Sequence, residues 1–329
     1  MQYRKFGNTG LVVSEIGFGA WAIGGGAMIG DTAIGWGDVN DADSARAIEA
    51  AIEAGITFFD TADIYGLGHS ESILGAALAH HQDAIIATKV GNVARSGQFT
   101  TDYSKDHILS ACEESLKRLK RDTIDYYQLH TVKRAQLEEG YCIEAMNLLQ
   151  EQGKIRYWGI SLNTFEPLPE ATYCMEQQLG SGFQVVLNLI NQQSLDLIRS
   201  GAKQGYGMIA RMPLQFGLLT GKFSATSQFD KNDHRHKRIT PELITLSQSA
   251  LEPVWELCTK YGCTKTAMAL SFILSYEEVS TVIPGIRTAV QVHSNTTGLV
   301  KLDAADKAMI EGLGKDTFVH LLQVIKAQG

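Results

Sequence analysis

The chain is poor in proline and cysteine and contains no long apolar run. Only 6 of its 329 residues are proline, roughly 2% against an average near 5%. No stretch of about 18 apolar residues is present, so no membrane span is expected. The opening residues, MQYRKFGNTG, lack the apolar core of a signal peptide. The five cysteines are scattered and odd in number, which favours reduced thiols in the cytoplasm over a disulfide framework or a metal site.

Basic charge is also scarce. The chain has 29 Lys and Arg against 36 Asp and Glu, a net charge of −7. A broad basic face for nucleic acid is therefore not expected. Neither a nucleic acid nor a membrane is predicted as a partner. A homo-oligomer remains possible, but nothing in the sequence predicts one.

Glycine, in contrast, is abundant. It supplies 32 residues, and ten of them lie among the first 40. Such a segment is compatible with a flexible linker, with tight turns, or with backbone that lies against a ligand. Composition alone leaves all three open.

Short apolar runs alternate with helical patterns along the chain. The runs are rich in Ile, Val, Phe and Tyr, as buried parallel strands are. Eight such alternations predict an α/β protein with a (β/α)₈ TIM barrel, and no linker divides residues 1–329, so one domain is expected. The predicted strands are Glu15–Phe18, Thr57–Phe59, Ala84–Thr88, Ile124–Leu129, Arg156–Ile160, Phe183–Asn188, Gly207–Ala210 and Ser280–Ile283. The predicted helices are Asp43–Ala54, Ser70–Ala79, Lys105–Leu119, Cys142–Gln152, Leu168–Gln178, Leu195–Lys203, Pro241–Tyr261 with Thr264–Leu274, and Thr288–Leu299.

Three further features lie outside the repeat. Residues 3–5 and 11–13 flank Asn8-Thr9-Gly10 and predict an N-terminal β-hairpin that closes the barrel floor. One extra C-terminal helix is expected over Asp303–Gly314, followed by a partly apolar tail. The long connections 19–42 and 212–239 follow strands, on the side where barrel enzymes build their sites.

Four polar residues occur at or just after the ends of predicted strands. Asp60, Lys89 and His130 end the second, third and fourth strands, and Tyr65 lies five residues beyond Asp60. The carboxyl ends of barrel strands share one mouth, so these side chains are expected to meet there. We call the four residues the tetrad.

The tetrad suits proton transfer to a carbonyl oxygen. A phenol is a weak acid at neutral pH, and a nearby ammonium group stabilises its phenolate form. A carboxylate keeps that ammonium group charged and in place, and an imidazole can donate a hydrogen bond to a substrate oxygen. This combination favours the reduction of an aldehyde or ketone by hydride transfer.

Five spaced motifs together resemble the aldo-keto reductase superfamily, from Arg4 to about Leu299. The resemblance implies a barrel that binds a nicotinamide cofactor without a Rossmann domain. It also implies that Tyr65 is the general acid, that Lys89 and Asp60 tune it, and that His130 orients the carbonyl. The motifs are Asp60-Thr61-Ala62-x-x-Tyr65-Gly66, Thr88-Lys89, Leu129-His130, Gly153-Lys154-Ile155-Arg156 and Gly159-Ile160-Ser161.

The same resemblance assigns cofactor contacts. Ser161 and Gln184 match the residues that bind the nicotinamide carboxamide, although Leu162 stands where the family usually has Asn. Arg211 occupies the position of an aromatic ring that stacks on nicotinamide in many members; a planar guanidinium can stack there but adds charge. The segment after Arg211 resembles the loop over the pyrophosphate, and its expected cofactor contacts are Pro213, Leu214, Gly217, Leu219, Gly221 and Lys222.

The last barrel unit favours NADP(H), with NAD(H) possible. Gly285 precedes the start of a helix, where free backbone N–H groups can bind a phosphate. Arg287 can pair with a 2′-phosphate. Gln291 and Asn295 lie one turn apart on one helix face and match the adenosine-binding residues.

Gly17-Phe18-Gly19-Ala20-Trp21-Ala22 formally fits a Rossmann fingerprint, but it is expected to open a loop rather than a helix. We expect Gly19 and Trp21 to lie beside the nicotinamide instead, and we expect Asp60 to contact the cofactor as well. The predicted substrate-pocket residues are Trp21, Trp36, Tyr65 and His130, and Phe216 is a further candidate for the pocket wall.

No metal is predicted, because the histidine-rich runs 80–81 and 233–238 lack carboxylate partners at helical spacing. Residues 222–240 could close over the cofactor as a lid.

The function predicted from these residues is NADPH-dependent reduction of an aldehyde, ketone or sugar carbonyl. An alternative is that the same site catalyses the reverse reaction, which would make the protein an NAD(P)-dependent sugar or polyol dehydrogenase. A third alternative is a cofactor-sensing regulatory subunit similar to potassium-channel β subunits.

Overall fold

Eight parallel strands form the centre of the molecule, as predicted. The computed structural model describes residues 1–328 except residues 31, 36 and 232. Neighbouring strands in the sheet follow chain order, as a (β/α)₈ barrel requires. The strands are β3 (Phe18–Gly19), β6 (Phe58–Asp60), β7 (Ile85–Val90), β10 (Ile124–His130), β11 (Ile155–Ser161), β12 (Gly182–Val186), β13 (Gly207–Arg211) and β14 (Thr281–Ile283).

Residues 15–19 close the barrel between β14 and β6. The Gly17 amide donates to Val282 O at 2.8 Å, and the Val282 amide donates to Glu15 O at 2.9 Å. Only Phe18 and Gly19 also pair with β6, opposite Phe59 and Asp60. The observed first strand therefore begins at Phe18 rather than at Glu15, because residues 15–17 bond to the β14 side, with the Glu15 amide also bonded to Gln2 O, and do not pair with β6.

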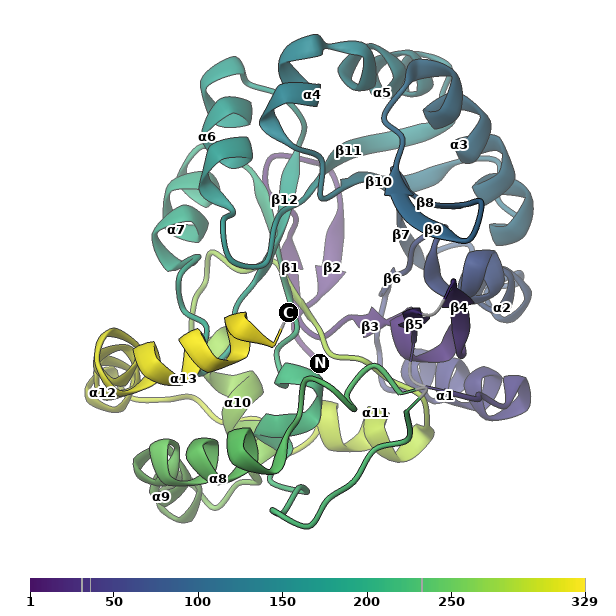
Figure 1. Cartoon of the computed structure of the whole chain (residues 1–329). Coiled ribbons are helices and arrows are strands. Elements are labelled where there is room, and N and C mark those ends of the chain that lie inside the picture. Colours follow the sequence, from purple (N-terminus) through teal and green to yellow (C-terminus); the bar gives the residue numbers. More distant parts are fainter. Residues whose placement is uncertain (31, 36, 232, 329) are drawn as a thin grey trace.

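Helices surround the barrel, as Figure 1 shows. The main hydrophobic core fills the layer between strands and helices. The helices are α1 (Asp41–Glu53), α2 (His69–Ala77), α3 (Lys105–Leu119), α4 (Arg134–Glu139), α5 (Tyr141–Glu151), α6 (Leu168–Gln177), α7 (Leu195–Lys203), α8 (Pro241–Ala250), α9 (Glu252–Tyr261), α10 (Lys265–Leu274), α11 (Ala289–Thr296), α12 (Ala304–Lys315) and α13 (Thr317–Ala327).

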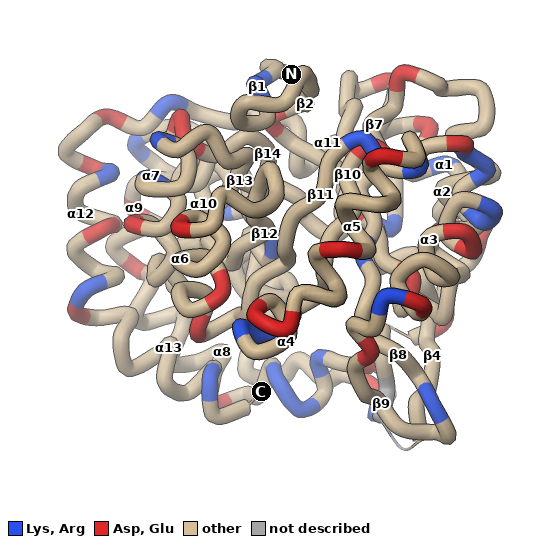
Figure 2. The backbone as a smooth tube through the Cα atoms, turned by 90° about the horizontal axis from the view of Figure 1, so that it is seen from above, with Lys and Arg blue, Asp and Glu red and all other residues tan. Residues whose placement is uncertain are grey.

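The predicted N-terminal hairpin is confirmed and packs under the barrel. Its strands β1 (Tyr3–Lys5) and β2 (Val12–Ser14) pair antiparallel. Phe6 enters the barrel floor, where its ring lies 4.9 Å from that of Tyr126. In Figure 2 this hairpin lies at the opposite end of the molecule from the β8–β9 hairpin described below.

Two helical predictions need correction. Residues 241–261 form two helices rather than one, because Pro253 has no N–H to continue the ladder from α8. The C-terminal part also contains two helices, α12 and α13, where one helix and a tail were expected. Phe318, Leu321 and Ile325 are buried at helical spacing, which explains why the tail is helical.

Several short elements were not predicted, among them two hairpins, the helix α4 and the 3₁₀ turn η1. The connection after β3 contains η1 (Ala20–Ile23) and the hairpin β4 (Ala27–Ile29)–β5 (Thr32–Ile34). A further hairpin, β8 (Asn92–Arg95)–β9 (Gln98–Thr101), follows β7. The two hairpins touch at their tips, since a Cβ placed on Gly30 would lie 2.5 Å from Gly97 O.

Acidic and basic residues alternate over the surface seen in Figure 2. Within the described part of the chain, no helix combines the length and apolar character that a bilayer crossing demands.

Candidate active site

Asp60 and Lys89 form a buried ion pair at the ends of adjacent strands. The parallel register places Asp60 opposite Ala87, two residues before Lys89. Lys89 is fully buried, and its Nζ lies 2.6 Å from Asp60 Oδ2 and 2.7 Å from Thr61 O. These two acceptors, together with Tyr65, fix the ammonium group.

Tyr65 lies in the 3₁₀ turn η2 (Tyr65–Gly68) that follows β6. Its hydroxyl oxygen is 3.2 Å from Lys89 Nζ. The turn depends on Gly66, which has φ +59°, and a Cβ there would lie 2.0 Å from Gly24 O. The close approach of two glycine backbones therefore sets the position of the phenol.

His130 ends β10 and lies beside Tyr65. The two rings are 5.9 Å apart and nearly perpendicular. The backbone of His130 is fixed by the Tyr103 hydroxyl, which donates to His130 O at 2.6 Å. The tetrad predicted from strand ends thus assembles at one mouth.

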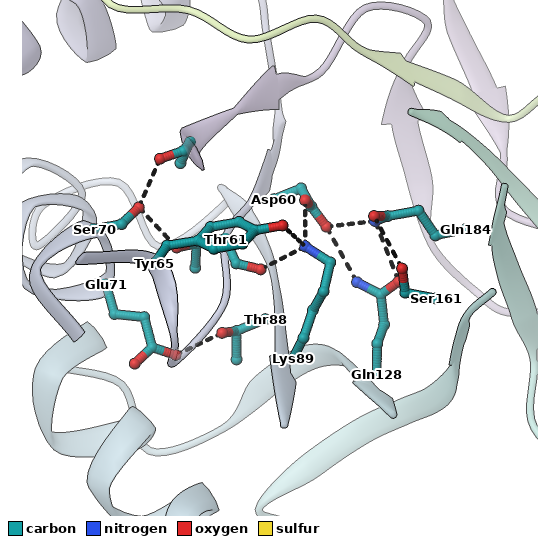
Figure 3. A network of polar contacts seen from close by, with 11 residues as sticks. Asp60, Thr61, Tyr65, Ser70, Glu71, Thr88, Lys89, Gln128, Ser161 and Gln184 are labelled. Carbon is teal, nitrogen blue, oxygen red and sulfur yellow. Dashed lines mark hydrogen bonds and ion pairs between the residues drawn. The ribbon is translucent and has the colours of Figure 1, made fainter. Parts of the chain in front are cut away.

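An amide network links Asp60 to the next strands, as Figure 3 shows. Asp60 Oδ1 accepts hydrogen bonds from Gln184 Nε2 at 2.7 Å and from Gln128 Nε2 at 3.1 Å. A carboxylate only accepts, so both amides must present nitrogen to it. Gln184 Nε2 also donates to Gln128 Oε1 at 3.2 Å, and Ser161 Oγ lies 3.4 Å from Gln184 Oε1. Gln184 Oε1 thus accepts a hydrogen bond from Ser161 and retains one further acceptor position.

Burial and charge set the ionisation of two tetrad members. Burial alone would lower the pKa of Lys89, but the Asp60 carboxylate and the Tyr65 hydroxyl outweigh it and raise that pKa. Burial, with the positive charges of Lys89 and Arg211, holds the pKa of His130 well below its usual value. At neutral pH the site therefore pairs a charged lysine with a neutral imidazole.

The model of the aldo/keto reductase family matches residues 15–315. The chain belongs to this family. It is accordingly an oxidoreductase, and its barrel fold agrees with the assignment.

Relatives of this aldo-keto reductase have several activities. L-galactose dehydrogenase of Arabidopsis thaliana is 30% identical over 92% of this chain and 90% of its own length. L-glyceraldehyde 3-phosphate reductase of Escherichia coli K12 is 30% identical over 94% and 91%. A probable voltage-gated potassium channel subunit beta of Oryza sativa subsp. japonica is 27% identical over 91% of each chain.

Solved structures agree over nearly the full length. An aldo-keto reductase from Bacillus halodurans, in its holo form, has a TM-score of 0.76 and 26% identity, covering 95% of this chain and 96% of its own. Glycerol dehydrogenase from Gluconobacter oxydans has a TM-score of 0.78 and 27% identity, covering 94% of each chain.

One large cavity opens at the barrel mouth of this aldo-keto reductase. Its volume is about 790 Å³. It brings together most of the residues predicted to bind cofactor or substrate. The predicted residues along its lining are Gly19, Trp21, Asp60, Tyr65, His130, Gln184, Arg211, Pro213, Leu214, Phe216, Gly217, Lys222, Gly285, Gln291 and Asn295.

Five predicted residues do not line this cavity. Lys89 and Ser161 lie one layer behind it, bonded to Asp60 and Gln184 respectively. Leu219 is fully buried in the core, and its amide is already bonded to Leu214 O. Gly221 ends the turn η3 (Gln215–Thr220), and Arg287 donates to Asp38 O at 2.8 Å. The predicted pocket residue Trp36 lies outside the described residues.

Unsatisfied polar atoms in the cavity wall fit a nicotinamide cofactor, which members of this family use. Asn295 is 3% exposed, and its Nδ2 has no hydrogen-bond partner among the described residues. Arg211 donates through Nη2 to Leu162 O and Thr164 Oγ1, while no described group accepts from its Nε. Buried donors of this kind are normally satisfied, so the wall has capacity for a polar ligand.

The segment 222–240 lies against the first long connection. The His234 amide donates to Gly35 O at 3.2 Å, and the His234 ring packs on Trp21 at 5.0 Å. Arg235 and Arg238 from this segment also line the cavity. Its backbone therefore borders the mouth, where a lid would lie.

Several site residues were missed by the sequence analysis. Gln128, which lies behind the cavity wall and bonds to Asp60 and Gln184, could have been noticed, because it precedes His130 by two positions and so shares its strand face. Asn92 and Phe99 come from the unpredicted β8–β9 hairpin, and Ile325 and Lys326 from the unpredicted α13. Nothing in the sequence pattern brings these last four to the mouth.

Proposed function

We propose that residues 1–329, acting as a single barrel domain, reduce an aldehyde, ketone or sugar carbonyl to the alcohol with NADPH. The observation that carries the proposal is the contact between the Tyr65 hydroxyl and Lys89 Nζ at 3.2 Å, in the wall of a cavity that also contains His130. A proton donor and a carbonyl-orienting group thus face the same space.

Tyr65 is the proton donor in this proposal. As negative charge develops on the substrate oxygen, the Tyr65 hydroxyl transfers its proton to it, and the Lys89 ammonium group stabilises the phenolate that remains. The Asp60 carboxylate, 2.6 Å from Lys89 Nζ, keeps the lysine charged. His130, neutral at neutral pH, donates a hydrogen bond to the same oxygen and orients it.

The cofactor, when bound, supplies a hydride to the carbonyl carbon. Gln184 presents Oε1 to the carboxamide, because Asp60 and Gln128 occupy both of its N–H groups. Gln291 and Asn295 on α11 hold the adenosine, and Arg287 pairs with the 2′-phosphate, which favours NADPH over NADH. The Gln291 side chain accepts a hydrogen bond from the Arg287 amide, so these two residues are positioned together.

Two relatives support a second candidate, oxidation of a sugar or polyol alcohol in the reverse direction. They are the L-galactose dehydrogenase and the glycerol dehydrogenase. Proton transfer at Tyr65 works equally in both directions. Similarity to the relative named as a channel subunit supports cofactor sensing as a third candidate.

The five free cysteines support a reducing compartment, the cytoplasm.

The test is cofactor consumption over a panel of aldehydes, ketones and sugars, with NADPH and NADH assayed separately. We expect NADPH-dependent reduction, with a kcat/KM at least about tenfold above that with NADH. Alcohol oxidation with NAD⁺ alone would favour the dehydrogenase. Turnover slower than a few cycles per minute on every substrate would favour cofactor sensing.

A further inference from the structure

Asn92 is a buried amide with an unsatisfied oxygen in the cavity wall. It is 7% exposed and lines the cavity. None of the residues that the structure describes donates a hydrogen bond to its Oδ1. A buried polar atom without a partner costs free energy, so such an atom beside a binding site indicates a ligand contact.

A second cavity amide provides the contrast. Asn163 also lines the cavity, but its Oδ1 accepts hydrogen bonds from the amides of Phe165 and Glu166 at 3.0 and 3.2 Å. That oxygen is used by the local turn. Within the described part of the chain, Asn92 has no such structural partner for its oxygen.

Asn92 lies on the substrate side of the mouth. It follows β7, and Val90 at the end of that strand pairs with Leu129, next to His130. Between Val90 and Asn92, Gly91 has φ +118° and packs so closely on Tyr103 that a Cβ would lie 2.0 Å from the ring. The Tyr103 hydroxyl in turn holds His130 O. One tyrosine therefore positions both His130 and the backbone that carries Asn92.

Most of the expected cofactor contacts lie on other strands. They come from β3, from β11 to β14, or from the turns and the helix α11 that follow these strands, and Asp60 at the end of β6 is the exception. Asn92 instead follows β7, the strand of Lys89, and neighbours the strand of His130. Its unpaired oxygen is thus placed near the carbonyl to be reduced rather than near the cofactor.

The chemistry of the Asn92 oxygen selects a neutral hydroxyl. A carbonyl oxygen repels carboxylates and phosphates but accepts a hydrogen bond from a hydroxyl. Ile34 and Phe99 line the same cavity and provide apolar contact for the carbon skeleton. We propose that Asn92 binds the hydroxyl on the carbon next to the substrate carbonyl, so that the enzyme prefers 2-hydroxyaldehydes and sugars to simple aldehydes. This inference rests on the proposed reductase function.

The experiment compares 2-hydroxypropanal with 2-methylpropanal, in which a methyl group replaces the hydroxyl. The wild-type holoenzyme should show a kcat/KM about tenfold or more higher for the hydroxyaldehyde. Asn92→Leu should remove this preference by lowering kcat/KM for 2-hydroxypropanal alone. Asn92→Asp keeps an acceptor oxygen and should retain most of the preference.

A second readout does not depend on turnover. Ligand-observed NMR in the presence of NADP⁺ should show tighter binding of propane-1,2-diol than of 2-methylpropan-1-ol to the wild type, and equal binding to Asn92→Leu. An equal loss of kcat/KM for both aldehydes in Asn92→Leu, or no change in kcat/KM for either, overturns the inference. A wild-type enzyme with equal kcat/KM for both aldehydes also overturns it, although the proposed reductase function then stands. A wild type that reduces no carbonyl compound refutes that function, and the Asn92 inference with it.

Discussion

Gln184 donates a hydrogen bond of 2.7 Å to Asp60 Oδ1, across three intervening strands of the barrel. The residue expected to bind the carboxamide is thereby joined to the residue that holds Lys89. Gln128 completes the link, since it bonds to both side chains. The residue expected to bind the carboxamide and the proposed proton donor are therefore connected through one buried network.

The Gln128→Leu variant tests this network. It removes a donor from the buried Asp60 carboxylate, which costs about 1.5–3 kcal/mol for a hydrogen bond to a charged group. We expect kcat to fall about tenfold or more, because Asp60 then holds the Lys89 ammonium group beside Tyr65 less firmly. NADPH affinity should change only a few-fold.

Tyr126→Phe is the matched control for Gln128→Leu. Tyr126 is buried on the same strand, and its hydroxyl has no hydrogen-bond partner in the described part of the chain. Its removal should leave kcat unchanged. If Gln128→Leu lowers Tm but leaves kcat at the wild-type value, Gln128 has only a structural role.

Arg287→Ala tests the preference for NADPH. Loss of a charge-assisted contact to the 2′-phosphate should raise the Kd of NADPH about 10- to 100-fold and leave the Kd of NADH nearly unchanged. Fluorescence titration of both cofactors measures the two values. Arg199→Ala is a suitable control, because Arg199 pairs with Asp196 and Glu311 on the outer helices. Equal weakening of both cofactors would contradict the assignment.

Asp63 gives a prediction about stability and pH. Burial, and then the nearby charge of Glu71, hold its pKa well above the usual value. Above the pKa of the unfolded chain, the folded state keeps a proton that the unfolded chain releases, so rising pH destabilises the fold through this group. Asp63→Asn removes the effect. Its free energy of unfolding relative to wild type should therefore increase from about pH 5 to about pH 8.

Urea unfolding at a series of pH values measures this difference for Asp63→Asn. The exposed Asp230→Asn serves as a control and should show a difference that does not vary with pH. A constant difference for Asp63→Asn as well would mean that Asp63 is ionised in the folded protein.

The tetrad could be predicted from the sequence because strand ends of a barrel converge. Asp60, Lys89 and His130 each end an apolar run, and the parallel register then brings them together without any further information. The same register places Ser161 beside His130 and Gln184 beside Ser161. This part of the site follows from alternation and strand order alone.

The outer wall of the cavity could not be predicted in this way. The β8–β9 hairpin lies where it does partly because its tip at Gly97 meets Gly30 of another hairpin, a contact between segments far apart in the sequence. The Ile325 side chain reaches the mouth only because α13 packs back across the barrel. Such positions depend on tertiary packing, which local patterns do not encode. The break between α8 and α9, in contrast, could have been predicted from the sequence, because Pro253 has no backbone N–H to donate.

Proton donation by Tyr65 is the central claim, and single-turnover hydride transfer in Tyr65→Phe tests it most directly. The substitution removes one hydroxyl and keeps the ring that packs beside His130. We expect hydride transfer from NADPH to slow by about 10²- to 10⁴-fold, with the Kd of NADPH within a few-fold of wild type. A Tyr65→Phe enzyme that transfers hydride at nearly the wild-type rate would contradict the account.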